Sequence, residues 1–141
     1  MKLTHKTTLI FLVTLSFLAQ AAPMAPELTQ AIHDGEHLFK NETFGGSGRF
    51  CNTCHLNGGT TKGQLPNGKA IPSLTNAAAI FPRFNAKANQ VMTLADQIQG
   101  CIGGAIGGKP PELGSPELNN LQIYVTSLAQ GKTLQMGGEP Q

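Results

Sequence analysis

The sequence has few of the residues that build a core able to stand on its own. It contains no Trp and one Tyr, and it carries 17 Gly and 9 Pro among its 141 residues. A small domain buries a limited fraction of its surface and often needs a staple or a cofactor. This scarcity argues against a self-sufficient core and indicates that a large apolar group supplies part of it.

The working chain also lacks an excess of positive charge. The full sequence has 10 Lys and Arg residues and 8 acidic residues. The excess of two is due to Lys2 and Lys6, which belong to an N-terminal segment that we expect to be removed. A nucleic-acid partner would call for a basic stripe on one face. The remaining chain is formally neutral, and this excludes nucleic acid as a partner.

No hydrophobic run is long enough for an ordinary membrane span. The apolar run at 9–19 is shorter than the roughly 20 residues that a spanning helix needs. It follows Lys2 and Lys6 and ends in Ala-Gln-Ala at 19–21, which is typical of a secretory signal peptide with its cleavage site. We therefore predict a signal peptide over 1–21 and a periplasmic protein, with membrane attachment only if this segment is retained.

Convincing strand alternation and internal repeats are absent too, and three helices account for most of the periodicity. They are expected at 26–40, from Thr93 to the glycines at 103–104, and at 115–131, with the start and end signals that helices prefer. The stretch 56–90 is expected to be mostly irregular. The sequence thus predicts one all-α domain over 22–131, followed by a loosely ordered tail over 132–141.

The first helix contains a glycine on its apolar side. Gly35 stands three residues after Ile32, and Phe39 follows one turn later. Because glycine weakens a helix interior, its presence there favours a close contact with another helix. We expect the partner to be the last helix, around Leu121 and Tyr124.

The strongest motif is Cys-Asn-Thr-Cys-His at 51–55. In Cys-x-x-Cys-His motifs two thiols attach haem covalently, and the histidine that follows reaches the iron. A zinc site would need further ligands, a redox dithiol lacks the expected βαβ surroundings, and a disulfide is the simplest alternative. Export and the thin core favour haem c, attached through Cys51 and Cys54 and ligated by His55.

The sixth position on the iron is less defined by the residues alone. Cys101 has no cysteine partner, and it is either a buried thiol or a thiolate ligand. Met92 lies between the motif and the last helix, where it could be a ligand or a packing residue. The other candidates are Met24, Met136, His33 and His37.

Together these features resemble the class I cytochrome c domain. The resemblance covers roughly 26–131 and implies a cytochrome c-like fold, in which the first and last helices cross beside a covalently bound haem. A second resemblance joins the segment 80–101, IFPRFNAKANQVMTLADQIQGC, to the A subunit of the Sox cytochromes and to thiosulfate dehydrogenases. It implies that Cys101 is the distal ligand, that Met92 is not, and that Arg83 lies near the haem.

Two functions follow from these resemblances. The first is a periplasmic monohaem electron carrier that exchanges single electrons with a redox partner protein, because the chain has one haem motif whereas thiosulfate dehydrogenases use two. The alternative is a catalytic or sulfur-carrying subunit, a thiosulfate dehydrogenase-like oxidoreductase, in which Cys101 is catalytic. There Arg83, and less strongly Lys109, would attract a small sulfur oxyanion.

Overall fold

A computed structural model describes residues 23–65 and 67–141, so the expected signal peptide at 1–21 lies outside the described residues. Among those residues, no helix combines the length and the apolar character needed to cross a membrane. The elements follow the order α1 (Pro26–Asn41), α2 (Cys51–Cys54), η1 (Asn57–Gly59), β1 (Gly63–Gln64), β2 (Ala70–Ile71), α3 (Ala77–Ile80), β3 (Arg83–Asn85), β4 (Gln90–Met92), α4 (Leu94–Cys101), η2 (Ile102–Ile106) and α5 (Pro116–Leu128).

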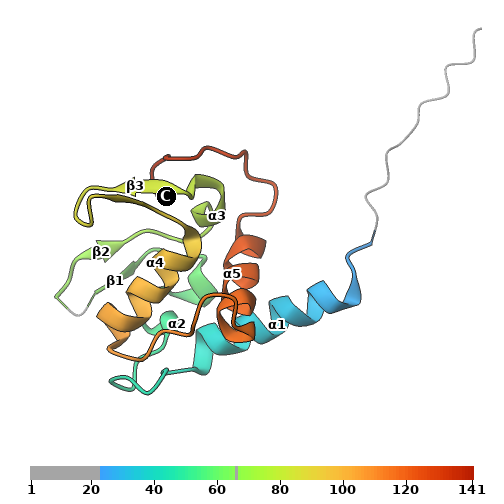
Figure 1. The fold of residues 1–141 in the computed structure, drawn as a ribbon, viewed down its shortest axis with the longest axis horizontal. Helices are drawn as coiled ribbons and strands as arrows, with labels where there is room; N and C mark the ends of the chain where they lie inside the picture. Colours follow the sequence, from blue (N-terminus) through green and yellow to red (C-terminus); the bar gives the residue numbers. More distant parts are fainter. Residues whose placement is uncertain (1–22, 66) are drawn as a thin grey trace, which may run out of the picture.

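Helices α1 and α5 cross in close contact, as the sequence predicted (Figure 1). A Cβ atom added at Gly35 would lie 2.0 Å from the backbone oxygen of Asn120, so only glycine fits at the crossing. One turn further, the ring centroids of Phe39 and Tyr124 are 5.3 Å apart in a tilted arrangement. The predicted cytochrome c-like, all-α fold is confirmed.

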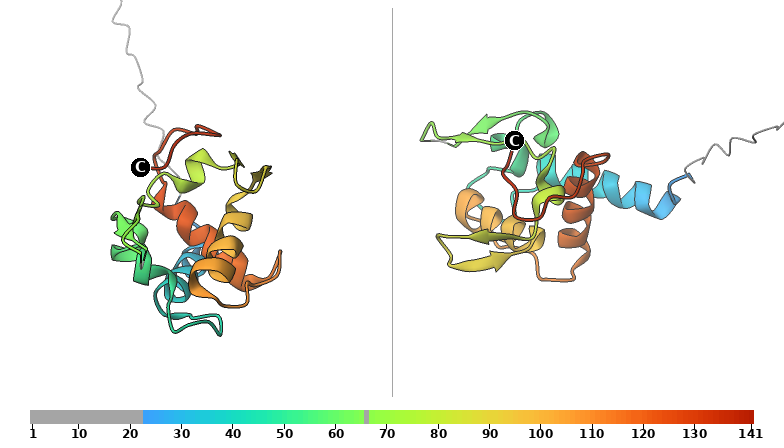
Figure 2. Two further views of the ribbon diagram at one scale, coloured as in Figure 1. Left: turned by 90° about the vertical axis from the view of Figure 1, so that its left-hand side faces the viewer. Right: turned by 90° about the horizontal axis from the view of Figure 1, so that it is seen from above.

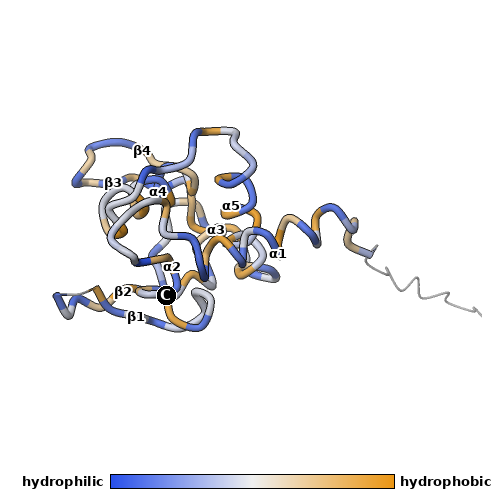
Figure 3. Tube along the Cα trace, turned by 90° about the horizontal axis from the view of Figure 1, so that it is seen from below, coloured by the Kyte–Doolittle hydropathy of each residue, from blue (hydrophilic) through white to orange (hydrophobic). Residues whose placement is uncertain are grey.

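The core lies between these two helices, α3 and the turn that follows α4. Apolar residues follow the inner sides of α1, α3 and α5 in the hydropathy-coloured trace of Figure 3. The buried cluster consists of Phe39, Ala77, Ile102, Ile106, Leu121, Tyr124 and Val125. It is a small core for a chain of this length, in keeping with the lack of large side chains.

The stretch 56–90 is more regular than expected. β1 pairs with β2, and β3 pairs with β4, in two separate antiparallel hairpins. The hairpins project from opposite sides of one end of the molecule (Figure 2). Their strands have two or three residues each, too few for the alternation by which strands are predicted.

Helix α4 begins as predicted and ends at Cys101, but helical turns continue beyond it. Thr93 accepts a hydrogen bond from the amide of Asp96, and the Asp96 carboxylate accepts one from the Thr93 amide, so the two residues form a capping box. The prediction that glycines 103 and 104 end the helix is wrong. The chain continues through the π-helical turn η2 to Gly107, whose φ of 72° lies in the left-handed region that glycine tolerates.

The C-terminal tail is held in place rather than loosely ordered. Backbone amides of Gln135 and Gly137 donate to the carbonyls of Ala79 and Ile80 at 2.7 and 2.9 Å. Beyond them the tail returns across the top of the molecule (Figure 1) and ends beside Ser73 and Asn76, which hydrogen-bond to Gln141. The prediction failed because backbone hydrogen bonds, which no side-chain pattern announces, hold this segment.

Candidate haem site

A cavity of about 590 Å³ opens between α2, α4, α5 and the β3–β4 hairpin, within the range that suits cofactor pockets. Its lining brings together all the principal site residues that the sequence predicted: Cys51, Cys54, His55, Arg83 and Cys101. Most of the remaining wall is apolar, with contributions from Phe39, Leu94, Ile98, Leu121 and Val125. Residues distant in the sequence therefore form one site.

The short helix α2 presents the motif to this cavity. The amide of Phe50 donates to Oγ1 of Thr53 at 3.1 Å, which closes the turn at the start of α2. A Cβ atom added at Gly63 would lie 1.7 Å from the carbonyl oxygen of Cys54, so strand β1 approaches the motif very closely. His55 follows as the residue that caps the helix. One turn thus places two thiols and one imidazole against the same space.

The imidazole of His55 is available as a ligand. Its Nδ1 atom is buried and makes no hydrogen bond of ordinary geometry. Burial lowers the pKa of His55, and the backbone carbonyl of Pro72 acts in the opposite direction. The ring lies beside Phe39, with centroids 6.2 Å apart. The fold thus favours the neutral imidazole, which is the form that binds metal ions.

The three cysteines are free thiols that lie near one another. Burial raises the pKa of Cys51 to about 12, and the neighbouring Cys101 contributes to this rise. Burial also raises the pKa of Cys101, whereas a hydrogen bond from Gln97 lowers it. Such thiols stay protonated at neutral pH unless a metal ion replaces the proton.

The candidates for the sixth ligand are placed very differently. Cys101, at the end of α4, lines the cavity, and Met92 is not among the lining residues. The Met92 sulfur instead accepts a hydrogen bond from Nδ2 of Asn85 at 3.1 Å. His33, Met24 and Met136 are exposed elsewhere on the described surface.

Three cations line the cavity, and no acidic side chain does so among the described residues. Arg83 was predicted from the sequence, whereas Arg49 and Lys87 were missed. Arg49 stands two residues before Cys51, and this proximity was the available signal. Arg83 also faces Glu139 of the tail at 3.8 Å. Lys109 is not part of the lining.

These residues fit a covalently held haem. Two thiols and an imidazole come from one helical turn, a third thiol faces the same space, and the wall between them is mainly apolar. The buried, unpaired Nδ1 of His55 and the small core are both consistent with a group that is meant to fill the cavity. A disulfide or a zinc ion would leave most of this space empty.

Comparison with known proteins agrees with this geometry. Residues 34–134 match the SoxA/TsdA cytochrome c domain family. The chain belongs to this family. Haem c is therefore its cofactor, and Cys51 and Cys54 occupy the positions of the attachment motif.

The curated relatives are longer proteins. A thiosulfate dehydrogenase of Stutzerimonas stutzeri (strain A1501) is 30% identical over 86 residues, which cover 61% of this chain and 26% of that protein. Another, from Thiomonas intermedia (strain K12), is 28% identical over 147 residues, 82% of this chain and 45% of the relative. The chain thus spans less than half the length of either protein.

Solved structures show the same relation. The thiosulfate dehydrogenase TsdBA from Marichromatium purpuratum superposes with a TM-score of 0.63 at 26% identity, covering 83% of this chain and 26% of that one. SoxXA from P. pantotrophus gives a TM-score of 0.61 at 15% identity, covering 79% of this chain and 37% of that one, and supports the fold alone.

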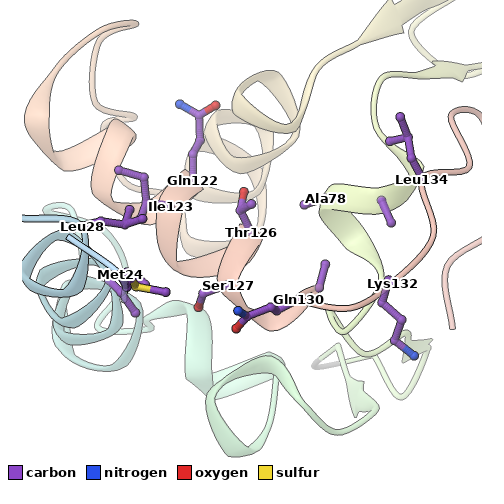
Figure 4. A pocket seen from close by; sticks show the side chains of 13 residues that line it. Met24, Leu28, Ala78, Gln122, Ile123, Thr126, Ser127, Gln130, Lys132 and Leu134 are labelled. Carbon is purple, nitrogen blue, oxygen red and sulfur yellow. The ribbon is translucent and has the colours of Figure 1, made fainter. Parts of the chain in front are cut away.

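A second cavity lies away from the motif. It measures about 470 Å³ and is mainly apolar, and its lining includes Met24, Leu28, Ile123 and Leu134 (Figure 4). It contains no Cys or His among its lining residues. The motif residues and Cys101 line the first cavity and not this one.

Proposed function

We propose that this chain is a periplasmic monohaem electron-transfer domain that works in the oxidation of sulfur compounds, in which His55 and Cys101 would ligate the haem iron. The observation that carries the proposal is the position of Cys101. A thiol distant in the sequence lines the same cavity as the attachment motif, in a chain of the SoxA/TsdA family.

The protein residues define the properties of the centre. Cys101 offers a soft, anionic sulfur, which stabilises the ferric state and lowers the reduction potential relative to a methionine ligand. His55 is held neutral by burial. When bound, haem c supplies a one-electron couple, and the apolar wall keeps water away from it.

Electron exchange with a partner protein follows from the single attachment motif. The sequence contains no second Cys-x-x-Cys-His to hold a further centre. Each electron must then pass directly between this domain and its redox partner. The greater length of the relatives supports a domain that works together with other parts or subunits.

A catalytic role is the second candidate, and the cationic lining favours it. Arg49, Arg83 and Lys87 would attract a doubly charged sulfur anion to the Cys101 side of the cavity. In the simplest reaction two thiosulfate ions form tetrathionate and release two electrons. A single centre would have to pass these electrons on one at a time.

Turnover measurements on the holoprotein separate the two candidates. As a carrier, the protein is reduced and reoxidised rapidly and reversibly, and it does not turn over thiosulfate with an artificial electron acceptor. Thiosulfate turnover that is lost in Cys101→Ala, while the haem remains attached, would establish the catalytic role instead. Catalysis also requires Arg83→Ala to raise KM for thiosulfate, whereas the control Lys109→Ala, outside the cavity, leaves it unchanged.

A further inference from the structure

One side chain contacts the sulfur of Cys101. Nε2 of Gln97 lies 3.3 Å from Sγ of Cys101, one helical turn away on α4. This distance suits an N–H···S hydrogen bond, because sulfur is a large acceptor. Both residues line the haem cavity. Within the described part of the chain, Gln97 makes no other side-chain hydrogen bond, so its carboxamide is committed to the sulfur.

The chemistry of the ligand fixes the direction of this bond. A thiolate can only accept hydrogen bonds, whereas a carboxamide has two N–H donors and one carbonyl acceptor. When Cys101 is a thiolate, Gln97 must therefore turn its N–H toward the sulfur. Gln97 is uncharged at every pH, so it supplies a donor without adding charge to the cavity.

A donor at the sulfur changes how strongly that sulfur donates electrons. Hydrogen bonds around a ligating cysteine are among the factors that tune the reduction potential of metal centres. We propose that Gln97 is a positioning residue that holds the Cys101 sulfur and raises the reduction potential of the centre by weakening its electron donation. This inference rests on the proposed ligation of Cys101.

The same helix provides a matched control. Gln99 has the same carboxamide, but its Nε2 donates to the carbonyl of Pro111 at 2.7 Å. Gln99 does not line the cavity. Removing either carboxamide costs α4 one side-chain hydrogen bond. A general weakening of the helix should therefore affect both variants, whereas an effect on the sulfur should follow from Gln97 alone.

The test is a redox titration of the holoprotein with Gln97→Leu and Gln99→Leu. Gln97→Leu keeps the size of the side chain and removes the donor. A hydrogen bond to a charged acceptor is strong enough to shift the ferric-to-ferrous equilibrium roughly tenfold, which is about 59 mV for one electron. We expect the Gln97→Leu potential to fall by this amount, with a shifted ferric spectrum, while Gln99→Leu matches the wild type.

A second variant keeps the test decisive if Gln97→Leu fails to retain haem. Gln97→Glu loses the donor and adds negative charge near the sulfur, so its potential should fall further. If the Gln97 variants keep the wild-type potential and the spectrum of a thiolate ligand, the proposed role of Gln97 is wrong, but the proposed ligation by Cys101 stands. A wild-type spectrum without thiolate ligation would overturn this role and the proposed coordination together.

Discussion

Tyr124 illustrates how single residues secure the site. Its hydroxyl donates to the carbonyl of Gly58 at 2.8 Å in a buried position, which links α5 to the turn just after the haem motif. Tyr124→Phe would leave that carbonyl without this donor. We expect a loss of roughly 1–3 kcal/mol in the free energy of unfolding, measured by denaturant titration of the holoprotein. An unchanged free energy of unfolding would show that water replaces the hydroxyl.

The contribution of Asp96 to stability should depend on pH. The amide and the hydroxyl of Thr93 donate to its carboxylate and lower its pKa below 3.8. A lowered folded-state pKa contributes stability above the unfolded value, and this contribution is lost as the pH falls through the folded value. Asp96→Asn should therefore lower Tm at neutral pH.

A comparison of Tm at low pH provides the control for Asp96. Once the wild-type carboxyl is protonated, well below pH 3.8, wild type and Asp96→Asn should have nearly the same Tm. A Tm difference of the same size at both pH values would contradict an electrostatic origin. In that case the cap would act through its shape.

At the scale of elements, the crossing of α1 and α5 depends on one glycine. A Cβ atom at Gly35 would lie 2.0 Å from the backbone oxygen of Asn120 and 2.7 Å from Cβ of Tyr124. Gly35→Ala must push the helices apart, and we expect it to cost about 1–3 kcal/mol in the free energy of unfolding.

Gly104 is the matched control for this crossing. A Cβ atom at Gly104 meets nothing within 4 Å, and its φ is not in the left-handed region. Gly104→Ala should be neutral or slightly stabilising, because alanine suits a helical turn better than glycine. Equal losses in the two variants, measured by denaturant unfolding, would contradict the close-crossing interpretation.

The tail is a second element whose attachment can be tested. Asn76 is 6% exposed, and its side chain donates to the carbonyl of Glu139 at 2.9 Å and accepts from the amide of Gln141 at 3.2 Å. Asn76→Ala should release the end of the tail and lower stability by roughly 1–3 kcal/mol. Limited proteolysis should then cut the tail faster than in Asn119→Ala, a control on the exposed side of α5. Equal cleavage rates would show that Asn76 does not hold the tail.

Across the whole molecule, the features that could be predicted from the sequence are those that depend on residues close together in the chain. Helix starts at Pro26 and Ser115, the Thr93 capping box and the glycine at the helix crossing all depend on contacts within a turn or on one steric requirement. The haem motif is equally local. For this reason the three longest helices, the crossing of α1 and α5 and the attachment residues could be predicted without coordinates, whereas the short helices α2 and α3 were not predicted.

Other parts of the molecule depend on contacts between distant segments. The two hairpins have strands too short to show a pattern, and the tail is held by backbone hydrogen bonds to α3. Arg49 and Lys87 line the cavity but lie in loops, whose path could not be predicted from the sequence. Gln97 and Cys101 are neighbours on α4, and their i,i+4 spacing was a local signal that the sequence reasoning did not use.

The central claim is that Cys101 would ligate the haem iron together with His55, and the spectrum of the purified ferric holoprotein tests it most directly. We predict that the wild-type spectrum lacks the long-wavelength band of a methionine ligand, changes in Cys101→Ala and is unaffected by Met92→Leu. A methionine band that persists in Cys101→Ala and disappears in Met92→Leu would contradict the claim.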